Sequence, residues 1–145
     1  MAGTIVADNI QAASTSTLVL KNGVANTPPT IQDSAGTQIG TFCRAWVNFN
    51  GTTNTGGFCT IRASFNVTSV ADNGTGDYTV NFTTAMPDAN YSVVTGGTRS
   101  DGVQSTILGL ISSVTAPSTT VVRLLNKDDS GTANDALYGC VAIFR

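Results

Sequence analysis

Apolar and polar residues alternate with a period of two through most of the last hundred positions of this chain. In residues 43–50, Ala45, Val47 and Phe49 fall on one face of an extended segment and Trp46 falls on the other. The alternation recurs, between turns rich in Gly, Asn, Asp and Ser, at residues 59–67, 78–82, 91–95, 105–111, 119–125 and 136–144. Helical spacing of apolar residues is nowhere sustained, so the pattern predicts an all-β fold.

The spacing of these segments adds two expectations about how they pair. Segments 59–67 and 78–82 are separated by turn sequence around Asn73–Gly74, which predicts a hairpin between them. The side chains expected to face inward from the first segment are Cys59, Ile61, Ala63, Phe65 and Val67. Seven or eight short strands with this aromatic content predict an antiparallel β-sandwich, jelly-roll-like in the broad sense.

The first 41 residues differ from the rest because all ten aromatic residues lie between Phe42 and Phe144. A segment without large apolar side chains cannot build a core of its own. It nevertheless keeps apolar residues that a solvated linker would not need, namely Ile5, Val6, Leu18, Leu20 and Ile31. We therefore expect an extended N-terminal arm at 1–41 that docks on another chain, and a β-sandwich domain at 42–145. A disordered tail is the alternative.

Charge is sparse and evenly scattered along the chain. Charged residues make up 11% of it, against about 25% in an average domain, and all nine acidic residues are Asp. The seven basic residues occur singly, so no basic stripe favours nucleic-acid binding. No apolar run approaches the roughly 20 residues of a membrane span. The first residues lack the features of a secretory signal, which predicts synthesis in a cytoplasm.

The absence of His and Glu limits the chemistry that the chain could perform. Ser-His-Asp and Cys-His constellations and Glu-based acid/base pairs cannot be assembled. A pair of Asp carboxylates could still hydrolyse a glycosidic bond. The candidates, all in predicted turns where Asp bonds to local amides, are Asp72, Asp77, Asp128, Asp129 and Asp135. We expect no enzymatic activity and no cofactor.

Metal binding and disulfide formation are also disfavoured. Residues 128–135 supply several oxygen ligands but lack the EF-hand register, so a hairpin loop is favoured over a calcium site. The three cysteines, Cys43, Cys59 and Cys140, have no zinc-site spacing. We expect them to be small buried hydrophobes, and a bridge between Cys43 and Cys59 remains an alternative.

Loops on a rigid β-scaffold commonly carry binding residues. Three predicted loops are candidates for surface recognition, through Asn73 and Asp77 in the first, Arg99 in the second, and Asp128 and Asp129 in the third.

The single Trp is a separate candidate for contact with another molecule. Trp46 is expected to pack between subunits or under the arm, and a sugar-stacking platform on an exposed face is the alternative.

Several sequence stretches resemble a known group of proteins. Residues Arg44–Thr52, Ile61–Val67 and Asn73–Tyr91 are similar to a segment that recurs in tail-fibre and other surface proteins of bacteriophages, including those of cyanobacteria and marine bacteria. Residues 28–40 resemble the linker that often precedes it, so the resemblance covers about residues 28–93. It implies a virion location and a binding or structural module, usually trimeric, and it carries over no catalytic residue.

The short arm decides between two roles on such a particle. Tail fibres usually carry long N-terminal regions, whereas an arm of about 41 residues favours a capsid cement or decoration protein. We therefore expect a homotrimer at the virion surface that docks on the major capsid protein through its arm. The alternative is a short tail fibre or receptor-binding tip that recognises host surface glycans.

Overall fold

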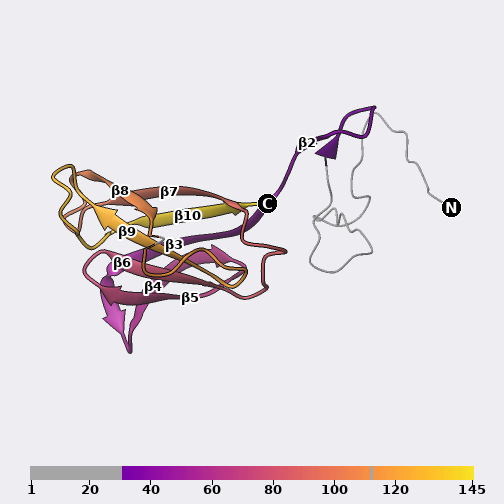
Figure 1. The fold of residues 1–145 in the computed structure, drawn as a ribbon. Helices are drawn as coiled ribbons and strands as arrows, with labels where there is room; N and C mark the ends of the chain where they lie inside the picture. The colour runs from indigo at the N-terminus through magenta and orange to yellow at the C-terminus, as the bar shows by residue number, and fades with distance from the viewer. Residues whose placement is uncertain (1–30, 112) are drawn as a thin grey trace, which may run out of the picture.

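The computed structural model describes residues 31–111 and 113–145, which form ten strands and no helix. The strands are β1 (Ile31–Gln32), β2 (Gln38–Gly40), β3 (Cys43–Thr55), β4 (Phe58–Phe65), β5 (Val67–Gly74), β6 (Asp77–Phe82), β7 (Ser92–Thr98), β8 (Ser105–Leu110), β9 (Val121–Lys127) and β10 (Gly139–Phe144). Strands β3 to β10 close into an antiparallel barrel in the order β10-β3-β4-β5-β6-β9-β8-β7 (Figure 1).

The prediction of an all-β fold is confirmed, but the prediction of a jelly-roll-like sandwich is corrected to a closed barrel. Strand β10 pairs with β3 on one side and with β7 on the other, which joins the two halves that a sandwich would leave apart. Strands β4 and β5 pair over a short stretch only. Phe58 lies opposite Ala71, and the Asp72 amide donates a hydrogen bond to the Gly57 carbonyl (2.9 Å). The alternation of apolar and polar residues could not distinguish a sandwich from a closed barrel, because in both folds each strand turns one face toward the core.

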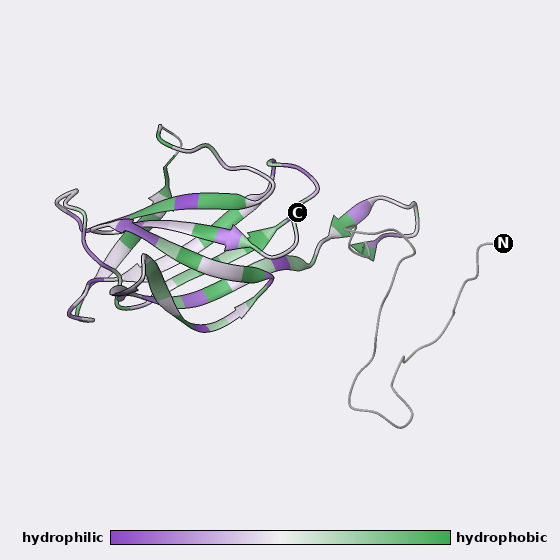
Figure 2. Ribbon diagram, turned by 90° about the horizontal axis from the view of Figure 1, so that it is seen from below, coloured by the Kyte–Doolittle hydropathy of each residue, from purple (hydrophilic) through white to green (hydrophobic). Residues whose placement is uncertain are grey.

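The barrel interior is filled by side chains from its inward faces. Ala45, Val47 and Phe49 of β3 are at most 2% exposed, as the alternation predicted. The rings of Phe49 and Tyr78 meet edge to face, with centroids 5.0 Å apart. Gly139 gives the Phe49 ring its space, because a Cβ there would lie 2.3 Å from Cζ of that ring. Figure 2 shows apolar residues alternating with polar ones along the strands.

The predicted hairpin between residues 59–67 and 78–82 is wrong. Residues Val67–Gly74 form a strand of their own, β5, and it is β5 that pairs with β6 across the turn. The predicted segment 59–67 ran through Asn66 into the first residue of β5, and residues 68–74 were left without a strand, because only Asn66 separates β4 from β5. A link of one residue leaves no cluster of turn-forming residues to mark the boundary.

The inward face predicted for β4 is correct at one end only. Cys59 is buried and Ile61 is half-buried, but Ala63 and Phe65 are exposed. The register between β3 and β4 shifts at Asn48 and Phe49, so that Phe65 lies opposite the outward Trp46. Val67 is buried, but on β5.

All three cysteines are free, so the alternative of a bridge between Cys43 and Cys59 is not realised. Cys59 is buried as expected, and burial raises the pKa of its thiol to about 12. Cys43 is half-buried. Cys140 is exposed, contrary to expectation, because β10 turns Val141 and Ile143 inward instead.

The N-terminal hairpin of β1 and β2 stands away from the barrel at the end where the C-terminus lies (Figure 1). It is joined to that end by a hydrogen bond from the Thr41 hydroxyl to the Arg145 carbonyl (2.9 Å). Ile31, one predicted arm anchor, is exposed on β1. The other anchors lie outside the described residues: Ile5, Val6, Leu18 and Leu20. Residues 31–111 and 113–145 contain no helix long and apolar enough to cross a membrane.

The link between β4 and β5 depends on Asn66, which has a φ of 56°. Its side-chain amide donates to the carbonyls of Arg44 (3.0 Å) and Thr84 (3.1 Å), and its Oδ1 accepts the Thr84 amide (2.7 Å). Asn tolerates this left-handed conformation better than most residues, because its short side chain bonds locally.

Replacing Asn66 should therefore separate backbone strain from hydrogen bonding. Asn66→Ala loses the side-chain bonds and strains the backbone, and we expect it to lower the free energy of unfolding by about 2 to 4 kcal/mol. Asn66→Gly loses the same bonds without the strain, so its loss should be about 1 kcal/mol smaller. Urea denaturation measures both values. Equal losses in the two variants would show that the positive φ costs nothing.

Candidate functional site

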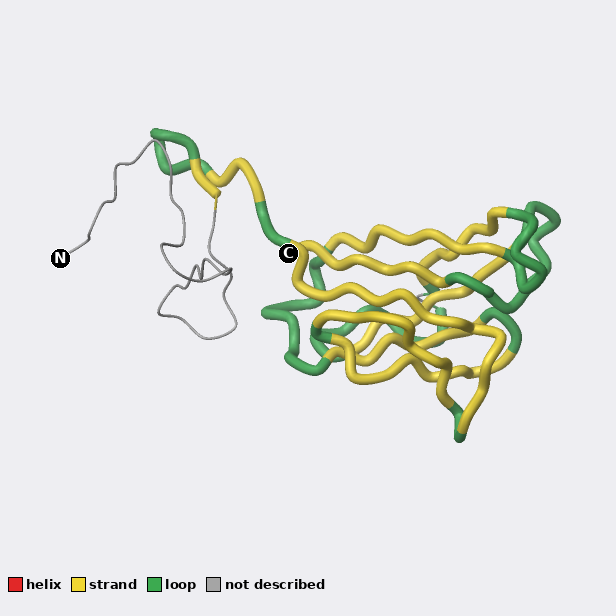
Figure 3. The backbone as a smooth tube through the Cα atoms, turned by 180° about the vertical axis from the view of Figure 1, so that it is seen from behind, coloured by secondary structure: helices red, strands yellow, loops and turns green. Residues whose placement is uncertain are grey.

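Four of the connections between barrel strands gather at one end of the barrel. Because neighbouring strands run in opposite directions, the β3–β4, β5–β6, β7–β8 and β9–β10 loops all lie opposite the N-terminal hairpin and the C-terminus (Figure 3). We call this the distal end. The three segments that the sequence indicated for recognition therefore lie at the same end of the molecule: Asn73 near the end of β5, Arg99 just after β7, and Asp128 just after β9.

The β9–β10 loop, residues 128–138, lies across the distal end and is fastened to several strands. Its hydrogen bonds run between Gly76 and Asp135 (2.8 Å), Gly51 and Ala136 (2.7 Å), Arg62 and Leu137 (2.8 Å), and Tyr138 and Thr98 (3.1 Å). Each partner comes from a different part of the barrel, so the loop closes the barrel end instead of extending into solvent.

Beneath this loop, two buried polar side chains satisfy its backbone. Tyr78 and Asn126 are both fully buried. The Tyr78 hydroxyl accepts the Ala136 amide (2.9 Å), and burial raises the pKa of Tyr78, which keeps the hydroxyl protonated. The Asn126 side chain donates to the Asn134 carbonyl (2.8 Å). Buried polar groups that are fully bonded fix one conformation, so the loop is ordered before any ligand arrives.

Gly76 is the point where the β5–β6 turn meets this loop. Its φ is +71°, and a Cβ at this position would lie 2.7 Å from the Asn126 carbonyl oxygen. Only glycine fits both the backbone conformation and the close approach.

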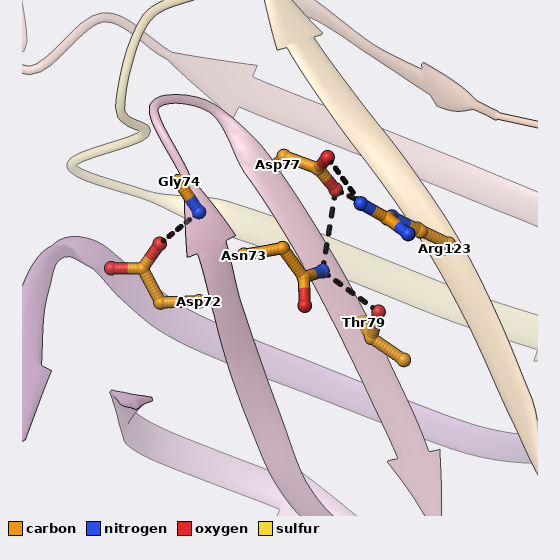
Figure 4. Close-up of polar contacts among 6 residues, drawn as sticks. All are labelled: Asp72, Asn73, Gly74, Asp77, Thr79 and Arg123. Carbon is orange, nitrogen blue, oxygen red and sulfur yellow. Dashed lines mark hydrogen bonds and ion pairs between the residues drawn. The ribbon is translucent and has the colours of Figure 1, made fainter. Parts of the chain in front are cut away.

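Asn73 and Asp77 brace the β5–β6 hairpin (Figure 4). The Asp77 carboxylate receives two bonds from Arg123 of β9, from Nε (2.8 Å) and Nη2 (2.7 Å). The Asn73 side chain donates to Asp77 (3.3 Å) and to the Thr79 hydroxyl (2.9 Å). The hydrogen bonds from Arg123 lower the pKa of Asp77. Both predicted recognition residues are therefore engaged within the chain.

Asp128 and Asp129 have different roles although they are adjacent. Asp128 Oδ1 accepts the amides of Ser130 (3.0 Å) and Thr132 (2.9 Å), and the bond from the Ser130 hydroxyl is the main cause of its lowered pKa. Asp128 thus shapes the loop. Asp129 is exposed and its carboxylate has no partner within the described part of the chain, so it remains available to a ligand.

Arg99, the remaining predicted residue, lies just beyond the end of β7. Its guanidinium contacts Gln104 (3.4 Å) and Asp101 (3.7 Å) within its own loop. It is exposed at the distal end with part of its hydrogen-bonding capacity unused.

An open groove of about 560 Å³ runs along the outer face of β8 and β9 to the β9–β10 loop. Ile107, Gly109 and Leu125 lie along it, and Lys127 and Asp129 stand where it meets the loop. Sequence reasoning missed the groove, although residues 107–111 are the longest apolar stretch of the chain. The sequence did contain a signal for the groove. The stretch 107–111 is apolar on both faces of one strand, and Gly109 lies on the outer face.

Two of the candidate aspartates, Asp77 and Asp128, lack the electrostatics of a general acid. A general acid needs a raised pKa, whereas the pKa values of Asp77 and Asp128 are lowered. Within residues 31–111 and 113–145, no three His, Cys, Asp or Glu side chains are grouped so that they could hold a metal ion. The site combines an apolar floor with one free carboxylate and one ammonium group.

Comparisons with known proteins give one structural match. No protein-family model matches this chain, and no curated protein matches it significantly. The chain is similar to part of the phiAB6 tailspike, whose structure was determined in complex with three-repeated oligosaccharides of Acinetobacter baumannii surface polysaccharide. The identity is 13% and the TM-score is 0.47, and the match covers 89% of this chain and 30% of the tailspike chain. A TM-score of this size is below that of a shared fold, so the match carries no functional conclusion for this chain.

Removing the buried hydroxyl tests whether it fastens the distal loop. Tyr78→Phe leaves the Ala136 amide without its acceptor, so we expect the free energy of unfolding in urea to fall by about 1 to 3 kcal/mol. Tyr138→Phe is the matched control, because the Tyr138 ring is exposed and its hydroxyl has no partner among the residues that the structure describes. Equal stability of the two variants would mean that the Tyr78 hydroxyl does not hold the loop.

The ion pair between Asp77 and Arg123 predicts a pH dependence of stability. Because the folded pKa of Asp77 lies below the ordinary value of 3.8, the pair stabilises fully above that value and its contribution is lost as pH falls through the folded pKa. At pH 7, Asp77→Asn should lower the free energy of unfolding by about 1 to 3 kcal/mol. The difference from wild type should shrink as pH falls below about 4. A difference that stays constant from pH 7 to pH 2 would contradict this assignment.

Proposed function

We propose that this chain is a bacteriophage surface protein that binds a host surface glycan through its distal end, with the N-terminal part attached to the particle. The resemblance over residues 28–93 supports a place on a phage particle. The observation that carries the binding role is the placement of the N-terminal hairpin at one end of the barrel and of four strand-connecting loops at the other. A protein anchored at the hairpin end presents the distal loops outward.

The chemistry of the groove supports a saccharide as the ligand. A sugar offers apolar C–H faces and many hydroxyl groups, and sites for such ligands combine apolar floors with a few placed polar groups. Ile107 and Leu125 supply apolar contact, while Asp129 accepts and Lys127 donates hydrogen bonds. The lowered pKa values of the neighbouring aspartates support binding without cleavage, so the proposed activity is non-enzymatic.

A capsid cement or decoration protein is the second candidate. The observation that favours it is the N-terminal hairpin, which stands off the barrel and exposes Ile31 and Ile39. Exposed apolar residues on a projecting hairpin suit docking on a neighbouring protein such as the major capsid protein. In this role three copies would act together, and the anchors Leu18 and Leu20 would add contacts.

Binding to immobilised bacterial surface polysaccharides tests the first candidate. We expect the purified chain to bind at least one polysaccharide, and the double variant Lys127→Ala, Asp129→Asn to weaken binding at least tenfold, because each lost bond involves a charged group. Asp33→Asn, which removes one charge at the opposite end, is the matched control and should bind like wild type. Failure to bind any polysaccharide, together with hundreds of copies of the chain on each particle, would favour the cement role instead.

A further inference from the structure

Arg62 of β4 is an exposed cation whose charge no carboxylate balances. Three other arginines, Arg99, Arg123 and Arg145, form ion pairs with aspartates. Within residues 31–111 and 113–145, no carboxylate lies at ion-pair distance from Arg62. The adjacent strands β4, β3, β10 and β7 contain no acidic residue. This part of the barrel surface therefore carries an excess of positive charge, although the net charge of the chain is −2.

The Arg62 guanidinium is held in place by contacts within its own chain. Its Nη1 donates to the Phe49 carbonyl (2.7 Å) and to Asn48 Oδ1 (3.3 Å), and its Nη2 donates to the Leu137 carbonyl (2.8 Å). The centre of the Tyr138 ring lies 4.2 Å from Cζ. These contacts leave the Nε–H and one Nη2–H without an acceptor among the described residues. A ligand that accepts from them meets donors already in position, which lowers the entropy cost of binding.

A second hydrogen-bond donor stands beside Arg62. Asn48 accepts from Arg62 through Oδ1, and its Nδ2 has no partner in the part of the chain that the structure describes. In register with Asn48 across the sheet come Cys140 and then Gly96. A Cβ built on Gly96 would have no atom within 4 Å. The surface next to Asn48 is therefore formed by small side chains, which leaves room for a ligand.

Trp46 gives the same surface an apolar contact. It lies two residues from Asn48 on β3, so both side chains point outward from positions about 7 Å apart. The Trp46 side chain is 40% exposed, and that of Tyr138, which lies against Arg62, is 45% exposed. Accessible rings beside a few placed polar groups are typical of sites for sugars, whose C–H faces pack on aromatic rings.

We propose that Arg62, Asn48 and Trp46 form a subsite for a sugar that carries a carboxylate, such as a uronic acid. The proposal rests on the proposed glycan-binding function and names the class of sugar. The carboxylate accepts hydrogen bonds from the Arg62 guanidinium and the Asn48 amide, and a C–H face of the sugar packs on Trp46. Hydrogen bonds between ionised groups are stronger than neutral ones, so the acid group provides selectivity.

The subsite and the distal groove are joined by one loop. Leu137 and Tyr138, which hold the Arg62 guanidinium, belong to the β9–β10 loop, and so does Asp129 of the groove. The groove lies over β8 and β9, whereas the subsite lies over β3 and β4. The residues of the two sites are different, so they can be altered separately.

Two matched ligands test the subsite: an oligomer of galacturonic acid, and the same oligomer after reduction of its carboxyl groups to alcohols. We expect the full-length chain to bind the acidic oligomer at least about tenfold more tightly in titration calorimetry. The emission of Trp46, the only Trp of the chain, should change when the acidic oligomer binds. Added salt should reduce the preference, because the subsite is exposed to solvent.

Asn48→Asp is the decisive variant. The new carboxylate keeps an acceptor for Arg62, so the contacts of Arg62 with the loop are retained, but it balances the cation and removes the amide donor. We expect the preference for the acidic oligomer to be lost. Replacing Arg62 itself would leave the Phe49 and Leu137 carbonyls unbonded and could unfold the loop. Asn90→Asp is the matched control, since it makes the same change of charge at an exposed position between β6 and β7, and it should keep the preference.

The proposal fails if the wild-type chain binds both oligomers equally, or if Asn48→Asp keeps the preference, and glycan binding through the groove would then stand without it. Unchanged Trp46 emission on binding of the acidic oligomer would also overturn it, because the acid would then bind elsewhere. Polyglutamate that binds as tightly as the acidic oligomer would show that the site does not select a sugar. A wild-type chain that binds neither oligomer refutes the subsite, and one that also binds no bacterial polysaccharide refutes the proposed function.

Discussion

The distal end of this protein depends on a few hydrogen bonds made in a place that water does not reach. Tyr78 and Asn126, both fully buried, bond to the backbone of the β9–β10 loop at Ala136 and Asn134. A buried polar group left without a hydrogen-bond partner costs more free energy than a hydrogen bond at the surface contributes. Other paths of the loop would leave Tyr78 and Asn126 unpaired, so these two residues hold the loop in one conformation across the barrel end. The free side chains of the loop, Asp129 above all, are thereby presented from a fixed backbone.

Closure of the barrel places different structural features at different parts of its surface. The antiparallel order places the N-terminal hairpin and the distal loops at opposite ends of the barrel. The proposed attachment and the proposed ligand binding would then use opposite ends of one small barrel. These two proposals rest on different residues, so one can fail without the other.

The sequence predicted the parts of this fold in which only one face of a segment is apolar. In β3, inward Phe49 lies between Asn48 and Asn50, and the inward face predicted for this strand was correct. In β10 both faces are apolar, so periodicity could not choose between Val141 and Cys140. The boundary between β4 and β5 was missed because its single residue, Asn66, turns the chain through backbone conformation. Among the site residues, the loop position of Asp128 was predictable, whereas Asp77 begins strand β6 and does not lie in the predicted loop. The engagement of Asp77 by Arg123 and of Asp128 by Ser130 could not be predicted, since it depends on strand pairing and local geometry. The groove was missed because it lies over β8 and β9, which become neighbours only on folding.

Amide hydrogen exchange in the wild-type protein tests most directly whether the distal loop is fixed before ligand binding. The amides of Gly51, Gly76 and Ala136 join this loop to the barrel. We predict that they exchange as slowly as amides in the middle of β3, in the absence of any ligand. Exchange at the rate of an unprotected loop, with the strands still protected, would show that the loop is not held and would contradict our account of the distal end.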